Sequence, residues 1–205
     1  MDEEQAPTPE ESRAIIDAQR RQVHARVYPD DRLLYGMWGL AWGVGYQAMF
    51  FDSSEIGQPG AVGGSIFAGL MILAAVATIV HSERRTQGLG GTSGTMTARL
   101  GASWGVAFGA SFFAFGGMFR FGVDGPGVAV MTNALPCLIV ACLFMGAGAA
   151  WNDGRQFRLG VWIAAITAVA SIVGPPHHYL VMSGLGGGGF LVAALRTQLE
   201  RRRHG

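Results

Sequence analysis

Thr132, Asn133 and Pro136, which lie within one long apolar run, are the residues most able to do chemistry away from water. Pro136 has no N–H to donate, and its ring clashes with the carbonyl group four residues earlier, that of Thr132. A helix here should kink and leave a free carbonyl group, with the Asn133 amide at the same depth. Many transporters build a solute or cation site from such broken helices. The alternative is a kinked structural helix whose Asn133 side chain bonds to a neighbouring helix.

A second unusual segment is a set of four consecutive glycines in the last apolar run: Gly186, Gly187, Gly188 and Gly189. Each glycine costs a helix roughly 1 kcal/mol relative to alanine. The segment therefore serves either very close packing against another helix or local unwinding. Unwinding opposite the kink at Pro136 would create a central site for a small neutral or weakly polar solute.

Two adjacent histidines, His177 and His178, could bind a metal or sense pH together with Asp52, Glu55 or Asp124. Adjacent histidines that precede an apolar run are more simply polar residues at a membrane interface. We therefore predict no metal site.

Other catalytic chemistry is excluded by residue type. The chain has no lysine, which rules out a Schiff base. Serines lie inside apolar runs but no histidine does, so an embedded serine protease lacks its general base. We predict no catalytic residues and no cofactor.

The chain contains six apolar runs without Asp, Glu, Arg, Lys or His, and two of these runs carry Asn133 and the four consecutive glycines. The runs are Leu33–Phe51, Ala61–Val80, Leu100–Phe119, Gly127–Ala150, Leu159–Gly174 and Tyr179–Leu195. Each is about 16–24 residues long, and a helix needs roughly 20 residues to cross a bilayer core. Only 14% of the chain is charged, against about 25% in soluble domains. The predicted fold class is all-α: a polytopic membrane protein with six transmembrane helices.

The arginines indicate how the runs are oriented. Of the 15 arginines, all but Arg120 lie before run one, between runs two and three, between runs four and five, or after run six. Cytoplasmic loops are rich in arginine, so we predict a multi-pass cell-membrane protein with both termini in the cytoplasm. Six buried helices of a soluble protein would scatter arginine evenly. The basic face can attract anionic membrane lipids, at about 1 kcal/mol per arginine, and does not indicate nucleic-acid binding.

Short segments flank the membrane domain. Residues 1–7 read as a disordered tail, 8–28 as a cytoplasmic amphipathic helix and 196–205 as a basic cytoplasmic tail. Thr8 and Glu11 have the spacing of a capping box at the helix start. One helix face could dock on lipid headgroups or on a partner protein; the alternative is a solvated helix that leads into the first run. The docking residues would be Ile16, Arg20, Val23 and Val27.

The first and third runs resemble each other. Trp, Gly, Ala, Gly and Ala coincide between Trp38–Ala48 and Trp104–Ala114, at an offset of 66 residues. Each odd run is also preceded by Arg-Leu. The pattern predicts three tandem two-helix hairpins that arose by duplication. The alternative is that common membrane rules shaped each helix independently.

Glycine supplies the packing signal, with 32 glycines in 205 residues against an average near 7%. Glycines four residues apart line one helix face, so that another backbone can approach closely. One such stripe holds Gly39 and Gly43, and a second holds Gly101, Gly105 and Gly109. We predict that each stripe meets another helix, in the same chain or in a second copy.

Two functions follow from these features. The docking-competent N-terminal helix, the glycine stripes and the missing active-site chemistry favour a membrane-embedded subunit or scaffold for a partner protein, with a homo-oligomer as a further arrangement. The alternative is a carrier or channel for a small neutral or weakly polar solute. The absence of lysine and the abundance of glycine and alanine indicate a bacterial protein from a GC-rich genome.

Overall fold

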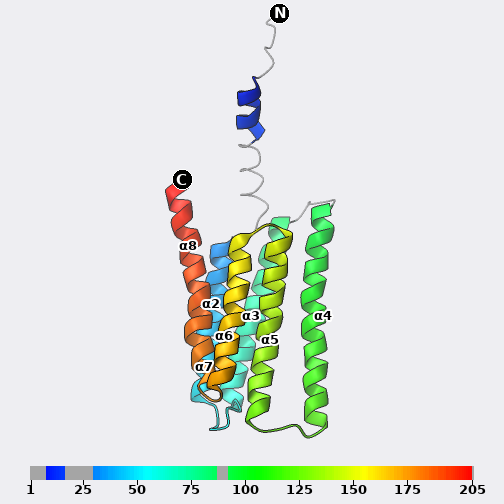
Figure 1. The fold of residues 1–205 in the computed structure, drawn as a ribbon, viewed down its shortest axis with the longest axis vertical. Coiled ribbons are helices and arrows are strands. Elements are labelled where there is room, and N and C mark those ends of the chain that lie inside the picture. The colour runs from blue at the N-terminus through cyan, green and yellow to red at the C-terminus, as the bar shows by residue number, and fades with distance from the viewer. Residues whose placement is uncertain (1–7, 17–29, 87–91, 205) are drawn as a thin grey trace, which may run out of the picture.

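The computed structural model describes residues 8–16, 30–86 and 92–204, and nearly all of them are helical (Figure 1). The helices from α2 to α8 lie side by side in one bundle, with α4 at its edge, and the short helix of residues 9–16 stands apart from it. Their bounds are α2 (Asp31–Phe51), α3 (Ala61–Thr86), α4 (Thr92–Arg120), α5 (Pro126–Ala150), α6 (Gly154–Val173), α7 (His178–Val181), the π-helix η1 (Met182–Gly187) and α8 (Gly188–His204). Segments α7, η1 and α8 follow one another without a break.

Five helical segments are long and apolar enough to cross a membrane: Ala61–Arg85, Gly94–Arg120, Pro126–Ala150, Gly154–Val173 and His178–Glu200. The sequence predicts six spans, and the first predicted span, Leu33–Phe51, corresponds to α2. Helix α2 falls outside the five because glycines and the polar side chains Tyr46 and Gln47 lower its hydropathy. The structure thus has five helices that suit a multi-pass membrane protein, and the sixth span stays a prediction.

The helices extend beyond the predicted apolar runs. Helix α3 continues past Val80 to Thr86, and α4 begins at Thr92 rather than at Leu100. The basic segment after Leu195 continues α8. Backbone hydrogen bonds can carry a helix through polar residues once it has formed, so an apolar run marks only the apolar part of a helix.

Packing is uneven around the bundle. Helix α2 packs against α3, α7, η1 and α8, and α5 packs closely against α6. Helix α4 packs mainly against α5, and more sparsely than the other long neighbours do. The closest pair, α5 and α6, therefore joins two different predicted hairpins. The arrangement as three tandem hairpins, with its origin by duplication, stays a prediction.

The core includes a cluster of aromatic rings around α2. Trp42 makes edge-to-face contacts with Tyr46 and with Phe190 of α8, at ring-centroid distances of 5.6 and 5.3 Å. Tyr46 and Tyr179 are nearly parallel, with centroids 6.2 Å apart. Such pairs favour tilted or offset geometry because of the ring quadrupoles. They fix α2 against the last helical segment.

Acidic side chains cap several helices. Asp30 accepts a hydrogen bond from the Arg32 backbone N–H at the start of α2, and Asp153 accepts from those of Arg155 and Gln156 at the start of α6. Asp52 accepts from the Gly63 N–H in the first turn of α3. A carboxylate near a helix start satisfies free N–H groups and complements the helix dipole. Asp52, which the sequence offers as a metal ligand, is thus used as a cap.

The N-terminal segment is described only over residues 8–16, of which 9–16 are helical. The predicted capping box forms: Glu11 accepts from the Thr8 N–H at 2.8 Å, and the Thr8 hydroxyl accepts from the Glu11 N–H at 3.2 Å. Hydrogen bonds from Thr8 also lower the pKa of Glu11. Ile16 is exposed. The other docking residues, Arg20, Val23 and Val27, lie outside the described residues.

Candidate functional site

A cavity of about 300 Å³ lies beside the middle of α5. Thr132, Asn133 and Pro136 of α5 form one wall. The other lining residues are Tyr46 and Met49 of α2, Gly64 and Phe67 of α3, Pro59, and Tyr179 of α7. Three long helices therefore line it, and the cavity is partly open. Its volume is at the lower end of the range for small-molecule sites, about 300–1,000 Å³.

Helix α5 runs without a break from Pro126 to Ala150, with Pro136 inside it. The Thr132 hydroxyl donates to the Val128 carbonyl, at 2.8 Å. A serine or threonine that bonds back to the preceding turn satisfies its own hydroxyl and often bends a helix. The Thr132 hydroxyl is thus already used by its own helix.

Asn133 is held by α2. The Tyr46 hydroxyl donates to Asn133 Oδ1 at 2.7 Å and lies 3.3 Å from Cys137 Sγ. Tyr46 is 3% exposed and Cys137 is 2% exposed. Buried polar groups need such partners because an unmet hydrogen bond is costly in an apolar setting. Asn133 thus bonds to a neighbouring helix, as the structural alternative expects, and also lines the cavity.

The chemistry of this cavity is that of neutral hydrogen bonding. Its lining supplies hydroxyl groups and the Asn133 amide, and none of the lining residues is acidic, basic or a histidine. No hydrogen bond uses the Asn133 amide N–H groups among the described residues, so they remain available to a ligand's acceptor atom. The arrangement suits a small, uncharged molecule that carries an oxygen acceptor.

The four glycines of the last segment lie elsewhere. None of Gly186–Gly189 lines the cavity. A Cβ atom at Gly187 would lie 2.7 Å from the Gly43 backbone nitrogen and 2.9 Å from the Gly39 carbonyl oxygen. A Cβ at Gly186 would lie 2.8 Å from the Trp42 ring. The structure does not bring these glycines together with Asn133 in one cavity, and Gly186 and Gly187 pack against α2 instead.

The remaining two glycines differ from each other. A Cβ at Gly189 would collide with the Trp162 indole, whereas a Cβ at Gly188 would meet nothing within 4 Å. The Trp162 Nε1 donates to the Leu185 carbonyl oxygen at 3.1 Å. This carbonyl lies in the π-helix η1, where backbone groups leave the regular α-helical pattern. The segment therefore combines close packing with a local departure from the α-helix.

The two glycine stripes have opposite surroundings. A Cβ at Gly39 would lie 2.8 Å from Leu191 and 3.0 Å from the Gly187 carbonyl oxygen. On α4, a Cβ at Gly101, Gly105 or Gly109 would meet nothing within 4 Å. A Cβ at Gly43 would also meet nothing within 4 Å, although a Cβ at Gly187 would lie 2.7 Å from the Gly43 backbone nitrogen. The α2 stripe is covered by η1 and α8, and the α4 stripe is open.

The two histidines also separate. His177 is exposed, and its ring lies 6.0 Å from that of Phe50. His178 is 0% exposed, and neither ring nitrogen has a hydrogen-bond partner among the described residues. His178 is therefore buried rather than a polar interface residue. In the described part of the chain, no group of three or more His, Cys, Asp or Glu side chains could hold a metal ion.

Sequence reasoning did not identify Tyr46, Cys137 or Ser183 as partners. The Ser183 hydroxyl lies within hydrogen-bond distance of the Gly43 carbonyl oxygen, at 2.8 Å, and of Gln47 Oε1, at 3.1 Å. The available signal was Tyr46-Gln47, where the resembling segment of α4 has Phe112-Phe113. Polar side chains inside an apolar run indicate interior positions.

No protein-family model matches the chain, and no curated protein or solved structure matches it either.

Proposed function

We propose that the chain is a membrane-embedded subunit, without catalytic activity of its own, and that a transmembrane helix of a partner protein packs against α4. The observation that carries this proposal is the open glycine stripe of α4. Small residues four apart let helix backbones approach closely in a membrane. The matching stripe on α2 receives such a neighbour from within the chain, and the one on α4 does not.

The proposal includes six spans, with both termini in the cytoplasm and the helices derived from three hairpins. Two contacts support α2 as the sixth span. Arg32, at the start of α2, donates to Gln198 near the end of α8. At the other end of the bundle, the Tyr179 hydroxyl donates to the Gly57 carbonyl oxygen, just beyond α2. Helix α2 has 21 residues, or about 31 Å at 1.5 Å per residue, enough for a bilayer core.

The test is recovery of the partner. Tagged protein is extracted gently from its native membrane, and the copurifying proteins are identified and quantified by mass spectrometry. We expect one stoichiometric partner, which is lost when Gly105→Leu fills the α4 stripe. Gly69→Leu on α3 is the matched control, because a Cβ at Gly69 also meets nothing within 4 Å. A clean monomer or a homo-oligomer of this chain would contradict the proposal.

A second candidate is a carrier or channel for a small neutral solute, and the cavity beside Asn133 favours it. Its test is Asn133→Cys in a background without Cys137 and Cys142, treated with a small water-soluble thiol reagent. A pathway requires reaction from at least one side of the membrane. Ala141→Cys is the negative control, because Ala141 is 0% exposed. No reaction from either side contradicts transport through this cavity.

A further inference from the structure

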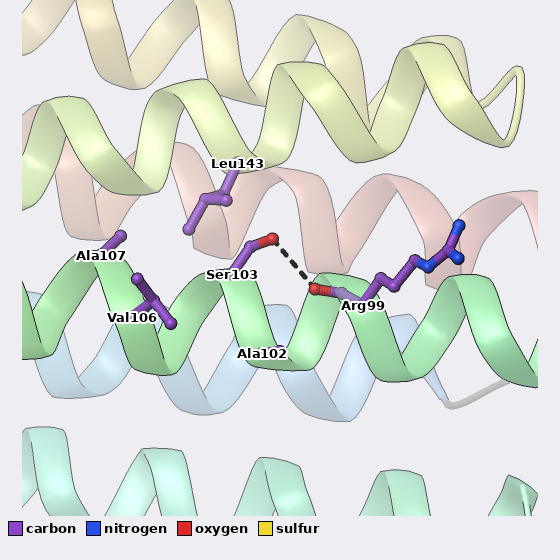
Figure 2. A pocket seen from close by; sticks show the side chains of 6 residues that line it. All are labelled: Arg99, Ala102, Ser103, Val106, Ala107 and Leu143. Atoms are coloured by element: carbon purple, nitrogen blue, oxygen red, sulfur yellow. Dashed lines mark hydrogen bonds between the residues drawn. The ribbon is translucent and has the colours of Figure 1, made fainter.

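A groove runs between α4 and α5, away from the cavity beside Asn133. Its volume is about 520 Å³, and its lining is Arg99, Ala102, Ser103, Val106 and Ala107 of α4 with Leu143 of α5. Figure 2 shows Arg99 at one end of the groove, with its guanidinium group pointing away from the apolar residues, and Leu143 reaching across from α5. The groove has one charged end and an apolar wall.

Polar groups of the wall are already satisfied. The Ser103 hydroxyl donates to the Arg99 carbonyl oxygen at 2.9 Å, as the dashed line in Figure 2 marks. The other wall residues are alanine, valine and leucine. A molecule in the groove therefore meets hydrocarbon along its length and finds a charged group only at the Arg99 end.

Arg99 differs from Arg32 and Arg155 in its partners. Arg32 pairs with Asp30 at 2.6 Å, and Arg155 pairs with Glu200 at 2.7 Å. The Arg99 guanidinium group has no carboxylate or other hydrogen-bond partner among the described residues. Its charge is free for an anion, and a guanidinium group binds the oxygens of a phosphate in a forked geometry.

The dimensions suit a lipid. Arg99 and Ala107 are eight residues apart, or about 12 Å along a helix axis. We propose that an anionic phospholipid occupies this groove, with its phosphate on the Arg99 guanidinium group and an acyl chain along Ala102, Val106, Ala107 and Leu143. The proposal rests on the membrane location proposed above and does not require the partner protein.

The groove and the glycine stripe occupy adjacent faces of α4. At about 100° per residue, Ser103 and Val106 point about 160° and about 100° away from Gly105, and Ala102 points about 60° away from it. A lipid and a partner helix can therefore bind α4 together. The two surfaces also differ in charge, because the lining of the groove includes Arg99, whereas the stripe consists of glycine alone.

The test titrates lipid into the purified full chain. Delipidated protein in detergent receives phosphatidylglycerol or phosphatidylcholine with the same acyl chains, and native mass spectrometry gives the apparent dissociation constants. We expect one tight phosphatidylglycerol, which Arg99→Gln weakens about fivefold, as roughly 1 kcal/mol per arginine implies. Arg84→Gln is the control, since Arg84 is exposed and lies outside the groove. Equal weakening by both variants overturns the proposal, because it indicates general attraction to basic surface.

A second variant tests the apolar wall. Ala102→Phe fills the groove and leaves Arg99 in place, so it should weaken phosphatidylglycerol binding as well. Unchanged binding by Ala102→Phe overturns the proposal. Competition by inorganic phosphate at the same concentration also overturns it, because a free anion would then suffice.

The outcome is separate from that of the partner search. If the unchanged chain binds phosphatidylglycerol no more tightly than phosphatidylcholine and the partner still copurifies, only the lipid site is rejected. Absence of a partner with selective lipid binding intact rejects only the subunit role. Circular dichroism of each variant confirms that the helices are retained.

Discussion

Helices α2 and α4 share a glycine pattern and differ in almost everything around it. In α2, Trp42 and Tyr46 are 4% and 3% exposed, and Gly39 lies against Leu191. In α4, Phe112 stands where α2 has Tyr46, and it is 76% exposed. The same spacing of small residues therefore occurs on a helix that packs against four neighbouring segments and on the most sparsely packed long helix. A glycine stripe permits another helix to approach closely, but close packing also requires a neighbouring helix on that face.

The side chains that differ between the two helices explain which one is enclosed. Tyr46 bonds to Asn133, and Gln47 lies within hydrogen-bond distance of Ser183, whereas Phe112 and Phe113 carry no polar group. A hydroxyl or amide in an apolar environment is costly unless it is hydrogen-bonded. Polar side chains are thus tolerated on α2, where the bundle supplies partners. The same polar side chains lower the mean hydropathy of α2, which is not among the five helices that are apolar enough to cross a membrane.

The largest difference in stability should come from placing leucine in each of the two glycine stripes. Gly39→Leu places a side chain against Leu191 and the Gly187 backbone, and overpacking of this kind costs about 3 kcal/mol. Gly105→Leu on α4 meets open space and should leave stability unchanged or slightly raised. The midpoint of thermal unfolding in detergent, followed by circular dichroism, gives both values. Equal losses would mean that the α4 stripe is packed within the monomer.

A smaller loss of stability should come from Gly187→Ala, which tests the contact between η1 and α2. The new methyl group would press on backbone atoms of Gly39 and Gly43, which cannot rotate away. We expect a loss of about 2 kcal/mol. Gly188→Ala is the control, because nothing lies within 4 Å of its Cβ position. A stable Gly187→Ala variant would refute the close contact between η1 and α2.

The smallest effect should come from exchanging the two aromatic residues. Tyr46→Phe removes the donor to Asn133 and leaves a buried acceptor, at a cost of about 1 kcal/mol. Phe112→Tyr places a hydroxyl without a partner on the exposed face of α4, so it should gain no stability in return. Chemical unfolding in mixed micelles measures both. If Tyr46→Phe costs nothing, the Tyr46–Asn133 bond does not contribute to the fold.

The sequence predicts the helical class and most of the apolar helices because these depend on local composition. It also singles out Thr132, Asn133 and Pro136, since polar residues and proline are rare in an apolar run, and these residues do line a cavity. It does not identify Tyr46 as the partner, because an aromatic residue with a hydroxyl suits a membrane interface equally well.

The four glycines show a different limit. Close packing and local irregularity are both compatible with Gly186–Gly189, and the structure contains both. Glycine spacing could not predict the difference between α2 and α4 either. Gly39 is covered by Gly187 and Leu191, which are about 150 residues away in the chain. Such long-range contacts leave no local pattern.

The most direct measurement is photocrosslinking in native membranes, with a photoreactive amino acid at position 105 of α4 or at position 40 of α2. Leu40 is 60% exposed and lies on the outer face of its helix, so position 40 reports the lipid environment. If α4 docks a partner, position 105 captures one protein that differs from this chain, and position 40 captures lipid. Lipid adducts at both positions, or capture of a second copy of this chain at position 105, would contradict the proposed subunit role.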